Sequence, residues 1–108
     1  MDENGALAAF SAISSATRLR ILKILVRAGD SGMTAGQIAE TVEATPSRAS
    51  FHLASLAEAG LVTSSRQSRR IIYSVDFAAM GGLVRYLMED CCNNNATVMA
   101  CCTGSGKC

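Results

Sequence analysis

The segment from Thr45 to Gly60 restricts the fold most, because it carries a helix start, a helix stop and two unlike faces. Thr45 is a favourable N-cap residue, and Pro46 stands at the first helical position, where its missing N–H costs nothing. Gly60 is typical of the residue that follows a helix. Apolar residues recur between these signals at helical spacing, namely Ala49, Leu53, Leu56 and Ala57. The pattern predicts an amphipathic helix that packs one face against a core.

The opposite face of this predicted helix is unusual for a surface exposed only to water. Ser47, Arg48, Phe51 and Ser55 point away from the apolar stripe on a helical wheel, and Ser50 and His52 lie at its flanks. Arginine and serine side chains bind phosphates and base edges, and an apolar side chain can contact a thymine methyl group. This face therefore favours DNA recognition.

Three further helices are expected before Thr45. The first covers Ala6–Ile13, the second covers Ala16–Ala28 and stops at Gly29, and the third begins at Thr34 with Gln37 at the capping-box position. Their apolar stripes are Leu7, Phe10 and Ile13 in the first, Leu19, Leu22, Leu25 and Val26 in the second, and Ala35, Ile38, Ala39 and Val42 in the third. The residues between Gly29 and Thr34 are expected to form a turn.

Two short strands are expected after Gly60, at Leu61–Arg66 and Arg69–Asp76, with Gln67-Ser68 at the hairpin tip. Three arginines surround that tip, namely Arg66, Arg69 and Arg70. Helix, turn, helix and then a basic hairpin is the order of a winged helix-turn-helix, in which the helix enters the major groove and the hairpin reaches phosphates or the minor groove. The alternative is a small helical interaction domain with a solvated basic hairpin.

The chain of 108 residues has the length of one domain, and its net charge of +1 favours no partner by itself. No apolar run is long enough to span a bilayer, and the N-terminus is acidic where a signal peptide would be basic. We therefore expect a cytoplasmic protein with no membrane partner.

The last expected helix runs from Phe77 to about Cys91, with Phe77, Met80, Val84, Leu87 and Met88 on one side. Gly81-Gly82 inside it favours close approach of another helix.

All five cysteines fall in the last eighteen residues, at Cys91, Cys92, Cys101, Cys102 and Cys108. In a reducing compartment such crowding favours metal-binding or redox-active thiols over structural disulfides. The alternatives are a site for a soft metalloid, a site for a soft metal such as cadmium or lead, a redox switch, or a tail without function. The residues after Cys92 are expected to form a flexible tail. An enzyme, such as a thiol-dependent arsenate reductase, is disfavoured because no phosphate-binding loop or Cys-x5-Arg arrangement accompanies the thiols.

The run ATPSRASFHLASLAEAGLVTSSRQSRRIIYSV resembles the recognition helix and wing of the ArsR/SmtB family of metal-sensing repressors. The matching positions are Ser50-x-His52-Leu53, Leu56-x-x-Ala59-Gly60-Leu61-Val62, Arg69-x-x-x-Tyr73-x-Val75 and the earlier Arg18-Leu19-x-Ile21-Leu22-x-x-Leu25. The resemblance implies a mostly α, homodimeric winged helix-turn-helix whose first and last helices form the dimer interface. It also implies release from operator DNA when a metal or metalloid binds. Ser68 departs from the family, which usually has glycine at the wing turn.

The resemblance also directs attention to the C-terminal thiols. The Cys-x-Cys motif of many arsenic and cadmium sensors is missing from the predicted third helix, and the last helix lacks the histidines that zinc, nickel and cobalt sensors use there. The cluster is similar to that of arsenite-responsive members, which implies As(III) bound by Cys91, Cys92 and either Cys101 or Cys102, with Cys108 as a spare thiol. Antimonite and methylated arsenicals remain alternatives, as does a second site at Cys101 and Cys102 or an organoarsenical held there by two thiols. Residues 1–91 would form the DNA-binding and dimerisation domain, and residues 92–108 a tail that contributes to the site. The expected DNA contacts are Ser47, Arg48, Ser50, Phe51 and His52 on the helix, and Arg66, Arg69 and Arg70 on the wing.

Overall fold

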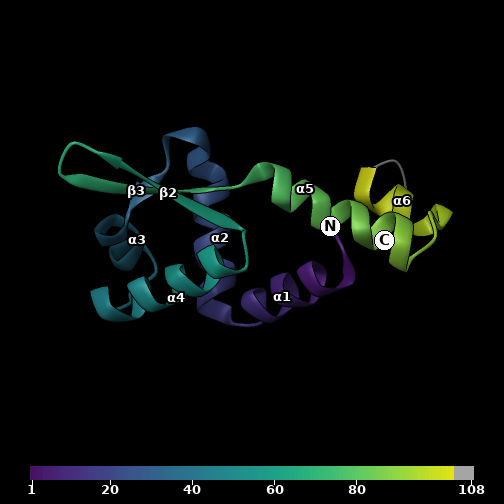
Figure 1. The fold of residues 1–108 in the computed structure, drawn as a ribbon, viewed down its shortest axis with the longest axis horizontal. Coiled ribbons are helices and arrows are strands. Elements are labelled where there is room, and N and C mark those ends of the chain that lie inside the picture. The colour runs from purple at the N-terminus through teal and green to yellow at the C-terminus, as the bar shows by residue number, and fades with distance from the viewer. Residues whose placement is uncertain (104–108) are drawn as a thin grey trace.

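The computed structural model describes residues 1–103, and its elements follow the expected order of helices and a hairpin (Figure 1). Four helices come first, interrupted by one short strand: α1 (Glu3–Ile13), α2 (Ala16–Ala28), the 3-10 turn η1 (Gly29–Ser31), β1 (Met33–Thr34), α3 (Ala35–Thr41) and α4 (Pro46–Glu58). The hairpin and the C-terminal helices follow: β2 (Val62–Gln67), β3 (Arg70–Val75), α5 (Phe77–Arg85), the π-helix η2 (Tyr86–Cys91) and α6 (Ala96–Thr103). The mostly helical, winged helix-turn-helix architecture is thereby confirmed.

Side-chain caps set the helix starts where the sequence predicts them. The Thr45 hydroxyl accepts a hydrogen bond of 3.2 Å from the backbone N–H of Arg48 at the start of α4. At α3, the Thr34 hydroxyl accepts from the N–H of Gln37, whose side-chain oxygen accepts in return from the N–H of Thr34. This reciprocal pair satisfies two backbone donors that a helix start leaves without partners. Helix α1 begins earlier than expected because the Asp2 carboxylate accepts from the N–H of Gly5.

The sheet has three strands in the order β1-β3-β2, rather than the two that the sequence predicts. Strand β1 is only two residues long, with Met33 opposite Tyr73 and Thr34 opposite Ile72, so the expected turn there is a strand that local sequence could not signal. Gly32 precedes it with φ +66°, and a Cβ atom at this position would overlap the carbonyl oxygen of Tyr73. Glycine is therefore required for β1 to approach β3 this closely.

The wing turns one residue later than predicted, at Ser68-Arg69 instead of Gln67-Ser68. Gln67 pairs with Arg70, which leaves two residues in the loop. Ser68 has φ +61°, the left-handed region that two-residue hairpin loops use and that glycine adopts most easily. The serine thus takes the backbone conformation for which the family usually has glycine. The tip keeps a tight hairpin and places Arg69 in the turn itself.

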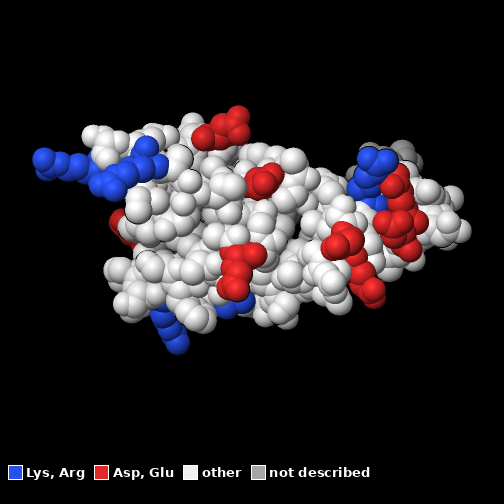
Figure 2. Space-filling view, in the orientation of Figure 1, with Lys and Arg blue, Asp and Glu red and all other residues white. Residues whose placement is uncertain are grey.

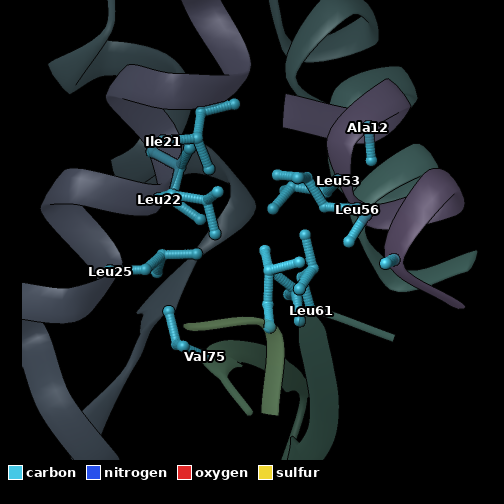
Figure 3. Packing of buried hydrophobic residues seen from close by; sticks show 13 residues of the cluster. Ala12, Ile21, Leu22, Leu25, Leu53, Leu56, Leu61 and Val75 are labelled. Atoms are coloured by element: carbon cyan, nitrogen blue, oxygen red, sulfur yellow. The ribbon is translucent and has the colours of Figure 1, made fainter. Parts of the chain in front are cut away.

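The core lies between α1, α2, α4 and the base of the hairpin (Figure 3). Leu53 and Leu56 of α4 are fully buried, as predicted, although Ala57 is exposed. The predicted stripes of α1 and α2 are partly wrong. Helix α1 buries the small residues Ala6, Ala9 and Ala12, and α2 buries Ile21 together with Leu22 and Leu25. Large apolar side chains of both helices stay exposed, at Leu7 (59%), Phe10 (40%), Leu19 (49%) and Val26 (45%).

Helix α5 shows the same reversal. Leu83 is its buried residue, whereas Phe77 and Val84 of the predicted stripe are 44% and 45% exposed. A Cβ atom at Gly81 would meet no described atom within 4 Å, so the close helix approach that this glycine favours does not occur within the described part of one protomer. An apolar face of α5 is therefore left uncovered by the described residues of one protomer.

The expectation of a flexible tail directly after Cys92 is wrong for residues 96–103, which form α6. Asn93 and Asn94 adopt φ +48° and +53°, a conformation that asparagine tolerates better than most residues, and they reverse the chain. The Asn95 side chain then accepts hydrogen bonds from the N–H groups of Thr97 and Val98 and starts the new helix. The asparagine run is therefore an ordered turn. The remaining predicted tail, including Cys108, lies outside the described residues.

Candidate functional site

The outward face of α4 carries the residues that the sequence selects for DNA contact. Ser47, Arg48, Ser50 and Phe51 are all exposed, and the Phe51 side chain, at 63%, is the most exposed large apolar residue among those described. Ala49, Leu53 and Leu56 bury the opposite face, which fixes the rotation of the helix. Packing thus presents this polar and aromatic face to the exterior.

His52 differs from its neighbours because it is half-buried and has a protein partner. Its Nδ1 accepts a hydrogen bond of 3.0 Å from Nε of Arg18, a residue of α2. The Arg18 guanidinium lies 5.7 Å from the centre of the Phe51 ring, and the Phe51 and His52 rings meet edge to face. Desolvation by burial, and then the positive charges of Arg18 and Arg48, hold the pKa of His52 below its ordinary value. These three side chains form what we call the Arg18 cluster: Arg18, Phe51 and His52.

The wing carries the second group of predicted contacts. Arg66, Arg69 and Arg70 are exposed, and Figure 2 shows basic side chains extending from the end of the hairpin. Nε of Arg66 donates a hydrogen bond of 3.4 Å to the carbonyl oxygen of Ser68, which turns this side chain back toward the tip. No acidic side chain contacts these arginines in an ion pair among the described residues. The wing tip is therefore a concentrated positive charge at one end of the molecule.

A groove of about 600 Å³ joins the helix face to the wing. It is lined by Ser50 of α4, by Arg69 and Arg70 of the wing, and by the first residues of α3, including Gln37. The structure thus brings Ser50 together with two predicted wing contacts that follow it in the chain by about twenty positions. Gln37 was not predicted to belong to this surface. Its capping motif did predict that it lies in the first turn of α3.

Comparison with known proteins agrees with this geometry. Residues 13–65 match a family model described as "Helix-turn-helix domain". The chain is 33% identical over 87 residues to the HTH-type transcriptional regulator YgaV of Escherichia coli, covering 81% of this chain and 86% of that protein. It is 31% identical over 94 residues to a "Probable mercury resistance operon repressor" of Streptomyces lividans, covering 87% and 72%. An ArsR-like transcriptional regulator from Rhodococcus sp. RHA1 shares the fold across 97% of this chain and 96% of its own, with a TM-score of 0.74 at 24% identity.

The chain belongs to the ArsR family of helix-turn-helix transcriptional regulators. A solved structure titled "Possible transcriptional regulator for arsenical resistance" is 32% identical, covers 74% of this chain and 79% of its own, and superposes with a TM-score of 0.62. This ArsR-family regulator is accordingly a DNA-binding protein and not an enzyme, as the sequence predicts. Among its described residues, no helix has the length and apolar character needed to cross a membrane.

Cys91 and Cys92 of this ArsR-family regulator lie far from its DNA-reading surfaces. The molecule extends 47 Å along its longest axis, with the wing at one end and the α5–η2–α6 segment at the other (Figure 1). Cys91 is an exposed thiol at the end of η2, and Cys92, half-buried, donates its backbone N–H to the carbonyl oxygen of Leu87. Any signal from these thiols must reach the DNA-binding elements through the protein, because the two sites cannot touch one ligand.

The predicted ligand set is not assembled in the described part of the chain. No three His, Cys, Asp or Glu side chains there are grouped closely enough to hold a metal ion. Cys101, in α6, takes part in a disulfide bond, which differs from the expectation that the clustered cysteines are all thiols. Thiols crowded into a short segment can reach one another, so pairing between sulfurs competes with binding of a soft ion. The side chain of Cys102 lies outside the described residues.

Proposed function

We propose that this ArsR-family regulator is an arsenite-responsive transcriptional repressor, released from operator DNA when As(III) binds C-terminal cysteine thiolates. The observation that carries the proposal is the position of Cys91 and Cys92, at the end of a helix whose apolar face is uncovered. A ligand at these sulfurs would act on the end of the helix that supplies the dimer interface. Relatives named for mercury and arsenical resistance support a thiophilic ligand for this chain also.

The chemistry of the cluster favours a soft trivalent ion. Thiolates select soft ions, and As(III) accepts three sulfurs. Cys91 and Cys92 supply two, and Cys101 or Cys102 supplies the third from α6, which the asparagine turn brings back toward them. Cys101 must first be released from its disulfide, since only a thiolate is a ligand. Sb(III) and methylated As(III) share this chemistry. In this arrangement residues 1–91 bind DNA and dimerise, and residues 92–108 complete the ligand site.

Homodimerisation through the first and last helices is part of the proposal. Leu7 and Phe10 of α1, and Phe77 and Val84 of α5, are large apolar side chains that the protomer leaves exposed. A groove of about 330 Å³ continues this surface between α2 and α5, and Leu19, Val26 and Met80 are among its lining residues. A related winged helix from Mycobacterium bovis, with the same fold, is titled homodimeric. A partner helix over Gly81 would also account for a glycine that meets nothing in the single protomer.

Release follows from a modest coupling between the two sites. The thiols end the helix that the dimer interface uses, so a ligand that joins η2 to α6 changes the spacing of the two reading helices. Two such helices bind successive major grooves of a near-palindromic operator, and their spacing sets the affinity. A coupling free energy of about 1–3 kcal/mol weakens DNA binding roughly 5–150-fold.

A redox-sensing repressor is the second candidate, because Cys101 is disulfide-bonded. In that case oxidation of the thiols, rather than a metalloid, would change the affinity for DNA. A sensor of cadmium or lead would use the same sulfurs with a different ion.

Titration of the DNA-bound, fully reduced dimer separates these candidates. We expect As(III) to raise the dissociation constant of the operator complex roughly 5–150-fold, measured by fluorescence anisotropy. Hydrogen peroxide, cadmium and lead are the comparison ligands. Release by peroxide alone, with no response to As(III), would contradict the proposal. An X-ray absorption spectrum of the As(III) complex counts the sulfurs and distinguishes three-thiolate from two-thiolate binding.

The wing arginines should contribute through phosphate neutralisation. We expect Arg69→Ala to weaken binding to operator and to unrelated DNA alike, and to reduce the slope of log affinity against log salt by about 0.9 for each protomer, or about 1.8 for the dimer. Arg85→Ala is the matched control, because Arg85 is exposed at the opposite end of the molecule and pairs with Glu89. A slope that is unchanged in Arg69→Ala would exclude a phosphate contact by this side chain.

A further inference from the structure

The contact between Arg18 and His52 joins two elements that sequence patterns treat separately. Arg18 is the first residue of the Arg18-Leu19-x-Ile21-Leu22 motif in α2, and His52 lies on α4 beside the DNA-reading residues. We infer that Arg18 is a positioning residue that holds His52 as the neutral imidazole with its proton on Nε2. The recognition helix then presents a fixed hydrogen-bond donor at this position, which is matched to an acceptor atom on DNA.

The tautomer follows from the donor and acceptor atoms of the contact. Nε of arginine always carries a hydrogen and has no lone pair to offer, because guanidinium stays protonated in proteins. The 3.0 Å bond from this atom therefore requires a lone pair on Nδ1 of His52. A neutral imidazole has one N–H, so the proton must be on Nε2. Arg18 thus decides which ring nitrogen donates, a choice that the histidine would otherwise leave open.

Three further interactions fix the position of Arg18, so its contact with His52 is supported by the surrounding structure. Its backbone N–H donates to the Ser15 hydroxyl, which starts α2. One terminal nitrogen donates at 3.5 Å to the carbonyl oxygen of Ala12 at the end of α1. The guanidinium also lies near the Phe51 ring, where a cation is attracted to the aromatic face. Arg18 therefore connects α1 and α2 to the outward face of α4.

The charges around His52 favour the neutral ring. Arg18 faces it from α2 and Arg48 faces it from α4, and both are cations, while the carbonyl oxygen of Ala12 at the end of α1 accepts a hydrogen bond from Arg18. Together with burial, these charges lower the pKa of His52 from its ordinary value of 6.5. Protonation would place a hydrogen on Nδ1, remove the acceptor that Arg18 needs and set two cations against each other. The contact is therefore formed above the pKa of His52 and lost below it.

The fixed donor defines the chemistry of its target, which is an acceptor atom. Nε2–H can donate to a phosphate oxygen, or in the major groove to N7 or O6 of a purine or O4 of thymine. The two sources differ in sequence dependence. A base contact discriminates operator from unrelated DNA, whereas a phosphate contact strengthens both equally.

The decisive measurement is the ¹⁵N spectrum of the His52 imidazole in the free dimer as a function of pH. We expect the wild type to show an Nε2–H tautomer at pH 7.5 and a titration midpoint below 6.5. Arg18→Met should mix the two tautomers and move the midpoint up toward 6.5, because it removes both the donor and one cation. Arg20→Met on the same helix is the matched control and should change neither property. A wild-type Nδ1–H tautomer would overturn the inference, and that result does not depend on any variant folding.

DNA affinity at pH 7.5 tests the consequence for recognition. We expect Arg18→Met to lose up to about tenfold in operator affinity, because the His52 ring is then neither held in place nor fixed in the tautomer that donates from Nε2. His52→Gln should retain most of the affinity, since its amide places an N–H near the position of Nε2. Loss on operator DNA alone identifies a base acceptor, and equal loss on unrelated DNA identifies a phosphate. Unchanged affinity in Arg18→Met would show that the cluster does not position the DNA-reading face.

Discussion

We expect a regulator in which Cys91 and Cys92 are both replaced by serine to bind operator DNA with unchanged affinity and to lose its response to As(III). DNA binding is preserved because both residues lie in the α5–η2–α6 segment, at the opposite end of the long axis from the wing (Figure 1). The response is lost because serine hydroxyls do not replace thiolates as ligands of soft ions. The expected change is the disappearance of a roughly 5–150-fold As(III) effect on the dissociation constant, measured by anisotropy with a labelled operator.

Single variants show whether the two sulfurs act together. Cys91→Ser and Cys92→Ser should each abolish the response if As(III) needs three sulfurs, and Cys108→Ser should leave it intact. Cys101→Ser and Cys102→Ser then identify the third ligand, because only one of them should fail to respond. If the double variant at Cys91 and Cys92 still releases DNA on addition of As(III), the ligand site is elsewhere in the chain.

Leu53→Ala should lower the free energy of unfolding by about 2–5 kcal/mol, the range for truncating a fully buried leucine. Leu53 has no exposed surface and belongs to the cluster in which α4 meets α2 and the base of the hairpin (Figure 3). Alanine there removes apolar contacts and leaves a cavity that the surrounding helices can only partly close. Urea unfolding at equal dimer concentrations measures the change, since dimerisation adds to apparent stability.

Phe51→Ala on the same helix is the matched comparison. Its ring is 63% exposed, so we expect the free energy of unfolding to change by only about 0.5 kcal/mol, while DNA affinity falls. The two variants together separate the packing face of α4 from its reading face. Equal destabilisation by both would mean that Phe51 is covered in the dimer, and would remove it from the DNA interface.

Protonation of His52 should also affect stability in a defined direction. Its pKa is lower in the folded protein than the ordinary value of 6.5, so the unfolded chain binds this proton at a higher pH than the folded chain does. Stability is then complete above about 6.5 and declines as the pH falls through the window below it. His52→Gln should remove this contribution to the decline, because glutamine does not titrate.

Local chemistry accounts for the elements that the sequence predicts well. Helix α4 begins at Thr45-Pro46 as predicted, and α3 begins with the predicted capping pair of Thr34 and Gln37. These signals act through hydrogen bonds to neighbours three residues away, so no distant contact is needed to read them. The exposed face of α4 can also be predicted from the sequence. An amphipathic helix with one strong apolar stripe buries that stripe, which fixes the rotation of the helix about its axis and therefore the face it exposes.

The errors arise where a contact between distant residues decides the outcome. Strand β1 exists because Met33 pairs with Tyr73, forty positions later, and two residues carry no strand pattern of their own. In α1, the burial of alanines instead of Leu7 and Phe10 reflects how closely that helix approaches the core, and this distance is a property of the assembled bundle. The same applies to Arg18, which looks like an ordinary solvated arginine until α2 and α4 are packed together.

The sequence by itself determined the winged helix-turn-helix order, the basic wing and the concentration of cysteines after residue 90, because composition and near-neighbour hydrogen bonds encode them. Only the tertiary structure decided which apolar faces are left uncovered, that Ser50 shares a groove with the wing arginines, and that Arg18 meets His52. It also decided that the segment carrying Cys91 and Cys92 lies at the far end of the molecule from the wing. Each of these depends on the packing of helices that are distant in the chain, where small shifts in position select one contact over another.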